Sequence, residues 1–136
     1  MSWNSPKVNW ASTDYFQLED WNRIVDNAQY LYDFLNATFA WKDCVLEDTA
    51  ALPYYDIVNN LEQNLYSLSQ TPGFVIVEFA ATTWQPRTSA LYTHNPSYQD
   101  FNRWEKFEYD LKYWNERMYT QLNGLYAGSF TAGTNR

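Results

Sequence analysis

The sequence contains very little cysteine, histidine or glycine: 136 residues include one Cys, one His and four Gly. A single cysteine excludes an internal disulfide, and we expect Cys44 to be a small buried hydrophobic residue. One His and one Cys cannot build a zinc site, and four Gly leave no Gly-rich phosphate loop. The acidic residues show no calcium-loop spacing. These absences predict a protein without a metal ion or cofactor.

Long hydrophobic runs and clusters of basic residues are also missing. No segment approaches the roughly 18 apolar residues needed to span a bilayer, so we expect no membrane contact. The first residues lack the regions of a signal peptide, which predicts a protein made in the cytosol and kept there or released in an assembled particle. Nine basic against sixteen acidic residues give a net charge of −7. That balance argues against nucleic acid as a partner.

Catalytic constellations are equally scarce. General acid–base and nucleophilic sites need convergent titratable groups, and the lone His94 lies in a polar loop without a recognisable partner in Cys44. Glu105 and Glu108 share one helix face, but carboxylates on a helix usually belong to a solvated face. We therefore expect that the protein is not an enzyme.

Aromatic residues, by contrast, are abundant: seven Trp, twelve Tyr and eight Phe make up 20% of the chain. A domain of this size cannot enclose so many rings, so some are expected to contact another molecule. Rings on irregular segments are the best candidates for contact with other protein: Trp3, Trp10, Trp84, Tyr92, Tyr126 and Phe130. An alternative ligand is a sugar, which Trp84 in Thr83-Trp84-Gln85-Pro86 is suited to stack against.

Hydrophobic periodicity predicts a mainly α fold with three helices, at about residues 16–39, 53–69 and 96–122. Pro96 suits the first turn of the third helix, and Asn123-Gly124 is expected to end it. The β-branched and aromatic run at about 74–79 predicts one short β segment. Residues 1–15 and 123–136 are expected to form extended arms on either side of a helical domain at 16–122.

Each of the three helices carries a related sequence pattern. When Asn22, Asn59 and Asn102 are aligned, an apolar residue precedes each Asn, another follows two residues later, and a Leu follows nine residues later. The three segments are therefore interpreted as repeated units with similar docking surfaces.

Two of the units also share the motif Asp-x-Asn-Arg. Asp20 and Arg23 are three residues apart, as are Asp100 and Arg103, so each pair can meet on one helix face. Asn60 replaces the Arg in the second unit. Because an exposed pair stabilises a helix by only about 0.2–0.5 kcal/mol, the motif suggests more than helix stability. The aligned Asn residues can offer their amides to another backbone, so contacts between helices are the expected role.

Several short motifs are spread over most of the chain: Lys7-Val8-Asn9-Trp10, Asp20 to Ile24, Asn60 to Leu65, Asn102 to Glu105, and Tyr126-Ala127-Gly128. In these patches the chain resembles small structural proteins of phages and prophages of Gram-positive bacteria. Such proteins belong to the virion, commonly the tail, baseplate or fibre region. The resemblance implies a non-catalytic structural or adaptor protein, made in the bacterial cytoplasm and located in the virion. Its implied partners are other virion proteins and copies of itself, and a host-recognition module that binds a cell-surface glycan is the alternative.

Overall fold

Three helices make up the regular structure of the described residues, 2–46 and 55–131, in the computed structural model. Side chains are described as far as Leu122. The helices are α1 (Leu18–Phe34), α2 (Tyr55–Ser69) and α3 (Tyr98–Thr131). The predicted mainly α class is confirmed.

The first helix ends earlier than predicted. After Phe34 the chain reaches Asn36, whose φ of 53° lies in the left-handed region that Asn tolerates better than most residues. The amide of Ala37 then bonds back to the carbonyl of Tyr32, which closes the helix end. The expected continuation to residue 39 is therefore wrong, because Asn36 turns the chain out of the helix.

The third helix ends later than predicted. It continues through Asn123 and Gly124 to Thr131, so the expectation of an extended tail from residue 123 is wrong over the described residues. Glycine inside a helix costs only about 1 kcal/mol relative to Ala, and it ends a helix only when it adopts a left-handed conformation. Residues 132–136 lie outside the described part of the chain.

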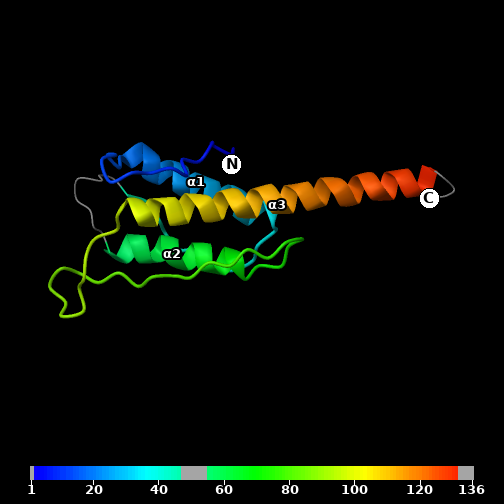
Figure 1. Cartoon of the computed structure of the whole chain (residues 1–136). Coiled ribbons are helices and arrows are strands. Elements are labelled where there is room, and N and C mark those ends of the chain that lie inside the picture. The colour runs from blue at the N-terminus through cyan, green and yellow to red at the C-terminus, as the bar shows by residue number, and fades with distance from the viewer. Residues whose placement is uncertain (1, 47–54, 132–136) are drawn as a thin grey trace.

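All three helices run in the same direction, and extended segments return the chain between them (Figure 1). Residues 2–11, 35–46 and 73–95 run against the helix direction before α1, α2 and α3 respectively. Each unit is thus an extended segment followed by a helix. The chain repeats this arrangement three times around one core.

The apolar positions of the repeat form that core. In each unit these are the residue immediately before the aligned Asn, the second residue after it and the ninth residue after it. All nine residues are at most 9% exposed. These residues are Trp21, Val58 and Phe101; Ile24, Leu61 and Trp104; and Leu31, Leu68 and Leu111. Cys44 is buried as expected, and burial raises the pKa of its thiol to about 12. Such a thiol has little of the reactive thiolate form.

Asparagine side chains bind the backbone of the extended segments. In five cases among the described residues, the side-chain amide of an Asn accepts a hydrogen bond from the backbone N–H of one residue in an extended segment. The same amide donates to the backbone C=O of that residue. The pairs are Asn27 with Asn4, Asn64 with Lys42, Asn115 with Val75, Asn102 with Trp10, and Asn59 with Trp84.

Residues 74–79 do not form the predicted β segment, and one of these bonds shows where a backbone of this run finds its partner. The described residues contain no strand, and the backbone of Val75 is bonded to Asn115 instead of to a neighbouring strand. An extended backbone needs partners for its polar groups, and here a helix side chain supplies them.

Candidate functional site

A buried carboxylate joins the first and third units. Glu105 on α3 accepts the indole N–H of Trp10 at 2.6 Å and two guanidinium N–H groups of Arg23 at 2.8 and 2.9 Å. Arg23 also bonds to Asp20 at 2.9 Å, so the predicted pair on α1 is present. Asn102, one turn before Glu105, holds the backbone of Trp10. One side of α3 therefore anchors both the N-terminal segment and α1.

The same arrangement joins the third and second units. Glu62 on α2 accepts the indole N–H of Trp84 at 2.9 Å and the guanidinium of Arg103. Asn59, three residues before Glu62, holds the backbone of Trp84, and Arg103 bonds to Asp100 at 3.1 Å. In both junctions, the Trp and Arg of one unit meet the Asn and Glu of another.

Among the described residues, the junction between the second and first units has no such charge pair. Asn60 stands at the position of the Arg, and Val25 stands at the position of the Glu. Asn60 instead donates to the backbone carbonyl of Asp43 at 2.8 Å. Both members of the pair are replaced together, so neither is left as an unpaired charge between the helices.

The two carboxylates that form junctions are fully enclosed. The side chains of Glu62 and Glu105 are 0% exposed, whereas Arg23 and Arg103 are 20% and 29% exposed. The hydrogen bond to Glu105 raises the pKa of Arg23. Burial acts to lower the pKa of Arg103, but the hydrogen bonds and negative charges of Glu62 and Asp100 together outweigh it and raise the pKa. The enclosed carboxylates are bonded on several sides to Arg and Trp side chains and so hold the units together.

Replacing Asn102 with Ala tests one such anchor. The change removes both hydrogen bonds to the backbone of Trp10, and we expect the free energy of unfolding to fall by about 1–3 kcal/mol because buried polar groups lose their partner. Urea denaturation followed by circular dichroism measures this loss. Asn9→Ala, at an exposed position next to Trp10, is the matched control. Equal stability of the two variants would rule out the anchoring role.

Beyond the junctions, α3 projects from the bundle (Figure 1). Counted from the aligned Asn, α1 ends after twelve residues and α2 after ten, whereas α3 continues for 29. At about 1.5 Å per residue, the extra 17 residues beyond the end of α1 extend for roughly 25 Å. The first residues of this outer part still contact the end of α1, because Tyr30 bonds to Glu116 at 2.6 Å and the rings of Phe34 and Tyr119 lie 6.4 Å apart.

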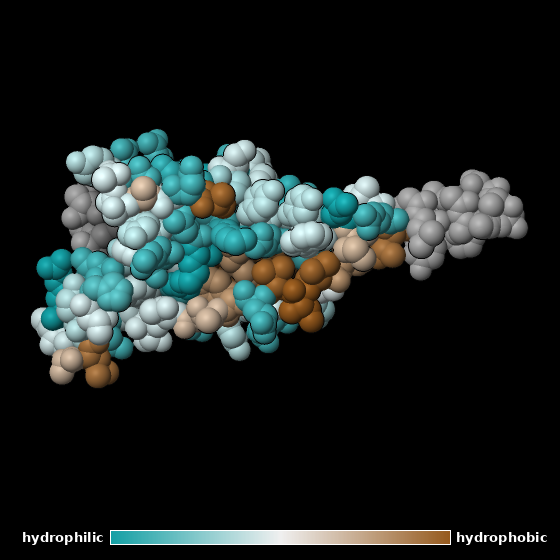
Figure 2. Space-filling view, viewed as in Figure 1, coloured by the Kyte–Doolittle hydropathy of each residue, from teal (hydrophilic) through white to brown (hydrophobic). Residues whose placement is uncertain are grey.

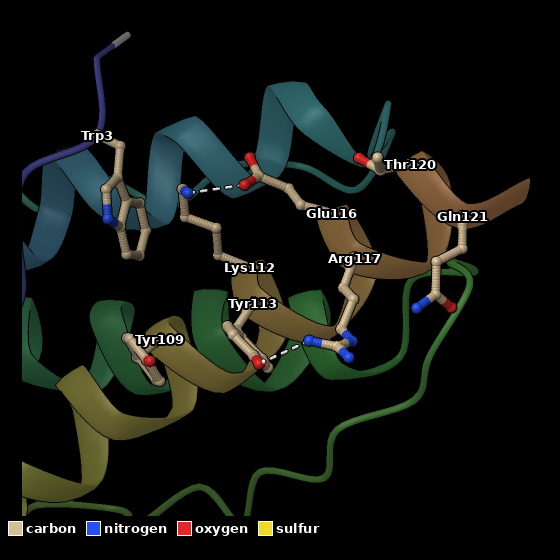
Figure 3. Close-up of a pocket in the computed structure, with 8 residues that line it drawn as sticks. All are labelled: Trp3, Tyr109, Lys112, Tyr113, Glu116, Arg117, Thr120 and Gln121. Atoms are coloured by element: carbon tan, nitrogen blue, oxygen red, sulfur yellow. Dashed lines mark hydrogen bonds and ion pairs between the residues drawn. The ribbon is translucent and has the colours of Figure 1, made fainter. Parts of the chain in front are cut away.

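A groove of about 490 Å³ lies where α3 leaves the bundle. Figure 3 shows Trp3, from the N-terminal segment, on one side of it and Tyr109 and Tyr113, from α3, on the other. The ring centroids of Tyr109 and Tyr113 are 5.8 Å apart with nearly parallel planes. Lys112 lies between the two sides and bonds to Glu116 at 2.7 Å. The groove thus combines aromatic walls with charged groups of both signs.

Charge in the groove is balanced locally. Glu116 accepts the hydroxyl of Tyr30 at 2.6 Å, which together with burial raises the pKa of Tyr30 to about 12. Burial acts to raise the pKa of Glu116, but the hydrogen bonds from Lys112 and Tyr30 and the charge of Lys112 together outweigh it and lower the pKa. Lys112 also lies 5.1 Å from the ring centroid of Trp3. The N-terminal segment, α1 and α3 are therefore linked at the mouth of the groove.

Large apolar residues are exposed around the same part of α3. Tyr113, Trp114 and Tyr119 are 40%, 46% and 49% exposed, and Ile76 in the neighbouring extended segment is 80% exposed. Figure 2 shows hydrophobic surface gathered beside the middle of the molecule, where α3 leaves the bundle. Large apolar residues exposed near one another mark interaction sites more often than scattered single residues do.

Two of the rings predicted to contact other molecules are buried. Trp10 and Trp84 are 5% and 6% exposed, because each lies in a junction and bonds to a carboxylate. They are not available surface in this structure, which corrects the prediction. Trp3 and Tyr92 are half-buried. Tyr126 and Phe130 belong to α3, in the stretch whose side chains are not described.

The predicted contact residues are largely brought together. Asp20, Arg23, Asn59, Asp100, Asn102 and Arg103 all lie in the two charged junctions, and Asn60 lies in the third. Asn22, by contrast, is exposed and lines a shallow groove with Trp41.

The role of the buried carboxylates differs from the prediction. Glu105 and Glu108 were expected on a solvated face, but both are 0% exposed, and Glu62 was not singled out. A signal was present, because Glu62 and Glu105 each follow the aligned Asn by three residues.

Within the described part of the chain, no group of three or more His, Cys, Asp or Glu side chains is placed to hold a metal ion. None of the helices described is long and apolar enough to cross a membrane. Comparisons with protein-family models, curated proteins and solved structures found no match.

Proposed function

We propose that this protein is a non-catalytic structural or adaptor protein of a phage virion, located in the tail or the baseplate and fibre region. It is made in the cytoplasm of the host bacterium and assembles with other virion proteins and with copies of itself, using the part of α3 that leaves the bundle. The observation that carries this proposal is the exposure of Tyr113, Trp114 and Tyr119 where α3 leaves the bundle. The sequence motifs shared with phage structural proteins support the choice of particle.

The design of the bundle supports an assembly role. The buried carboxylates Glu62 and Glu105 serve to join units, and each is surrounded by indole and guanidinium donors. A rigid body of this kind presents one long helix in a defined direction. Preorganised surfaces bind with a smaller entropic cost than flexible ones.

The composition of the exposed surface fits contact with protein. Tyr, Trp and Arg are enriched in the residues that dominate binding energy at protein interfaces, and Tyr113, Trp114 and Arg117 lie within five residues of one another on α3. Arg117 donates to the hydroxyl of Tyr113 at 3.0 Å, which holds the two side chains in place.

Incorporation into particles tests the proposal. Phage particles from the bacterium that encodes the chain are purified on a density gradient, and the chain is detected in the fractions by immunoblotting. We expect it to sediment with the particles, and Tyr113→Ala with Trp114→Ala to reduce incorporation at least about tenfold, because hot-spot rings contribute about 2 kcal/mol or more each.

Tyr15→Ala is the matched control, because Tyr15 is 87% exposed but lies far from the projecting helix in the segment before α1. It is expected to be incorporated normally. Purified particles in which the wild-type chain is not detected would contradict the proposed function.

Glycan binding is a second candidate function. The groove of Figure 3 is a better candidate site for a sugar than Trp84, because Trp84 is buried. Trp3, Tyr109 and Tyr113 are rings that a sugar can stack against, and Gln121 lies at the same groove. Binding to a glycan array that disappears in Tyr109→Ala would support this candidate over protein docking.

A further inference from the structure

We propose that the outer face of α3 is the contact surface for a second copy of this chain, with the two α3 helices packed antiparallel about a two-fold axis between Tyr113 and Trp114. This inference rests on the proposed use of α3 for assembly and names the partner. The outer face is defined as Lys106, Asp110, Tyr113, Arg117 and Gln121, with Tyr109 and Trp114 on its flanks.

The outer face is continuous and lies opposite the core. Its members recur every three or four residues, so they share one side of the helix. Trp104, Glu108 and Leu111 lie on the other side and are at most 2% exposed. The outer face therefore runs along α3 from Lys106, beside the core, to Gln121 on the projecting part.

Charges on the outer face are self-complementary in only one direction. About the proposed axis, Asp110 of one copy lies opposite Arg117 of the other, and Tyr113 lies opposite Trp114. This pattern occurs twice, once on each side of the axis, as a two-fold interface requires. A parallel pair would place Asp110 against Asp110 and Arg117 against Arg117, which repel.

The distribution of charge over the whole chain agrees with the same arrangement. The projecting residues 115–131 contain Glu116 and Arg117 and so carry no net charge, which leaves the whole charge of −7 on the rest of the chain. Antiparallel packing lays the neutral projecting part of each α3 along the acidic body of the other copy, whereas parallel packing would bring two acidic bodies together. Because like charges repel, the antiparallel direction is favoured.

The rings supply the apolar part of the contact. Tyr109 and Tyr113 are 44% and 40% exposed and stack on each other, while Trp114 meets Tyr113 edge to face at 4.9 Å. The cluster is therefore ordered before a partner arrives. Covering it in both copies removes the aromatic surface at the base of the projecting helix from water.

A charge exchange between copies tests the register. We expect the wild-type chain to be a dimer by light scattering at high concentration. Asp110→Arg and Arg117→Asp are each expected to weaken self-association at least about tenfold, because two like-charged contacts replace two opposite ones. An equimolar mixture of the two variants is expected to form dimers again, with one chain of each kind. Lys42→Glu, at an exposed position on another segment, is the control and is expected to dimerise normally.

A cysteine pair tests the direction. Lys106 lies opposite Gln121 in the antiparallel register, so a mixture of Lys106→Cys and Gln121→Cys chains is expected to form an intermolecular disulfide, whereas either variant alone does not. The native Cys44 is buried at 3% exposure and does not interfere. A wild-type monomer at high concentration, or crosslinking of either variant with itself, would overturn the proposal.

The two proposals fail separately. A chain that is monomeric but sediments with particles would overturn the antiparallel dimer and leave the virion role supported. A chain that dimerises by the charge exchange but is absent from particles would overturn the virion role and leave the dimer supported.

Discussion

Replacing Glu62 with Leu is expected to lower the free energy of unfolding by about 3–5 kcal/mol, the range measured when one member of a buried charge pair is removed. Glu62 accepts hydrogen bonds from the indoles of Trp84 and Trp104, from the guanidinium of Arg103 and from the backbone of Thr82. Its loss leaves all of these donors without their shared acceptor. The extended segment, α2 and α3 then lose a common contact.

Chemical denaturation of Glu62→Leu beside Glu78→Leu measures the effect, because Glu78 is an exposed acid in the same extended segment as Trp84. The control is expected to change stability by no more than about 0.5 kcal/mol. Adding Arg103→Leu to Glu62→Leu is expected to recover part of the loss, since the partly buried guanidinium, which then keeps only Asp100 and the carbonyl of Ala80 as partners, is removed as well. Equal stability of Glu62→Leu and Glu78→Leu would show that the junction is not a main source of stability.

Replacing Glu108 with Met is expected to stabilise the protein, in contrast to Glu62→Leu. Glu108 is fully buried, neither of its carboxylate oxygens has a hydrogen-bond partner among the described residues, and Ala28 and Leu65 occupy the same position in the other units. Because an unsatisfied buried polar group costs about 1–3 kcal/mol, we expect Glu108→Met to raise the free energy of unfolding by a similar amount at neutral pH.

The pH dependence of this effect has a defined direction. Burial, reinforced by the negative charge of Glu105, raises the pKa of Glu108 well above the ordinary value of 4.5, and the charge of Arg23 only partly opposes the shift. The folded protein therefore holds a proton that the unfolded chain releases. The contribution of Glu108 is most favourable below pH 4.5 and is lost as the pH rises from there through its pKa in the folded state.

Stability curves of the wild type and Glu108→Met across the pH range separate this contribution from that of the other carboxylates. The difference between the two proteins is expected to be constant in acid and to grow above pH 4.5 in favour of Met. Glu108→Gln, which does not titrate, is expected to remove the pH-dependent part alone. A difference that stays constant across the whole range would contradict a neutral buried Glu108.

Much of the fold could be predicted because periodicity is a local property. The apolar spacing around Ile24, Leu61 and Trp104 placed three helices and their buried faces correctly. The helix ends were less predictable, since Asn36 ended α1 through its backbone conformation and Gly124 did not end α3. Whether a residue adopts a left-handed conformation depends on the contacts around it as well as on its identity.

The site was predicted in part. Alignment of the units identified Asn59, Asn102 and the two Asp-x-Asn-Arg motifs as contact residues. It missed the role of Glu62 and Glu105, because a carboxylate on a helix is usually solvated and only the approach of a Trp and an Arg makes its burial favourable.

The sequence by itself determined the mainly α class, the repeated pattern and the large share of rings, because each follows from composition or from spacing along one helix. Only the tertiary structure decided that Trp10 and Trp84 lie inside, bonded to Glu105 and Glu62, and that the exposed rings gather on α3. These partners are 95 and 22 residues apart in the chain. Their burial depends on three helices and three extended segments meeting in space, which no local pattern specifies.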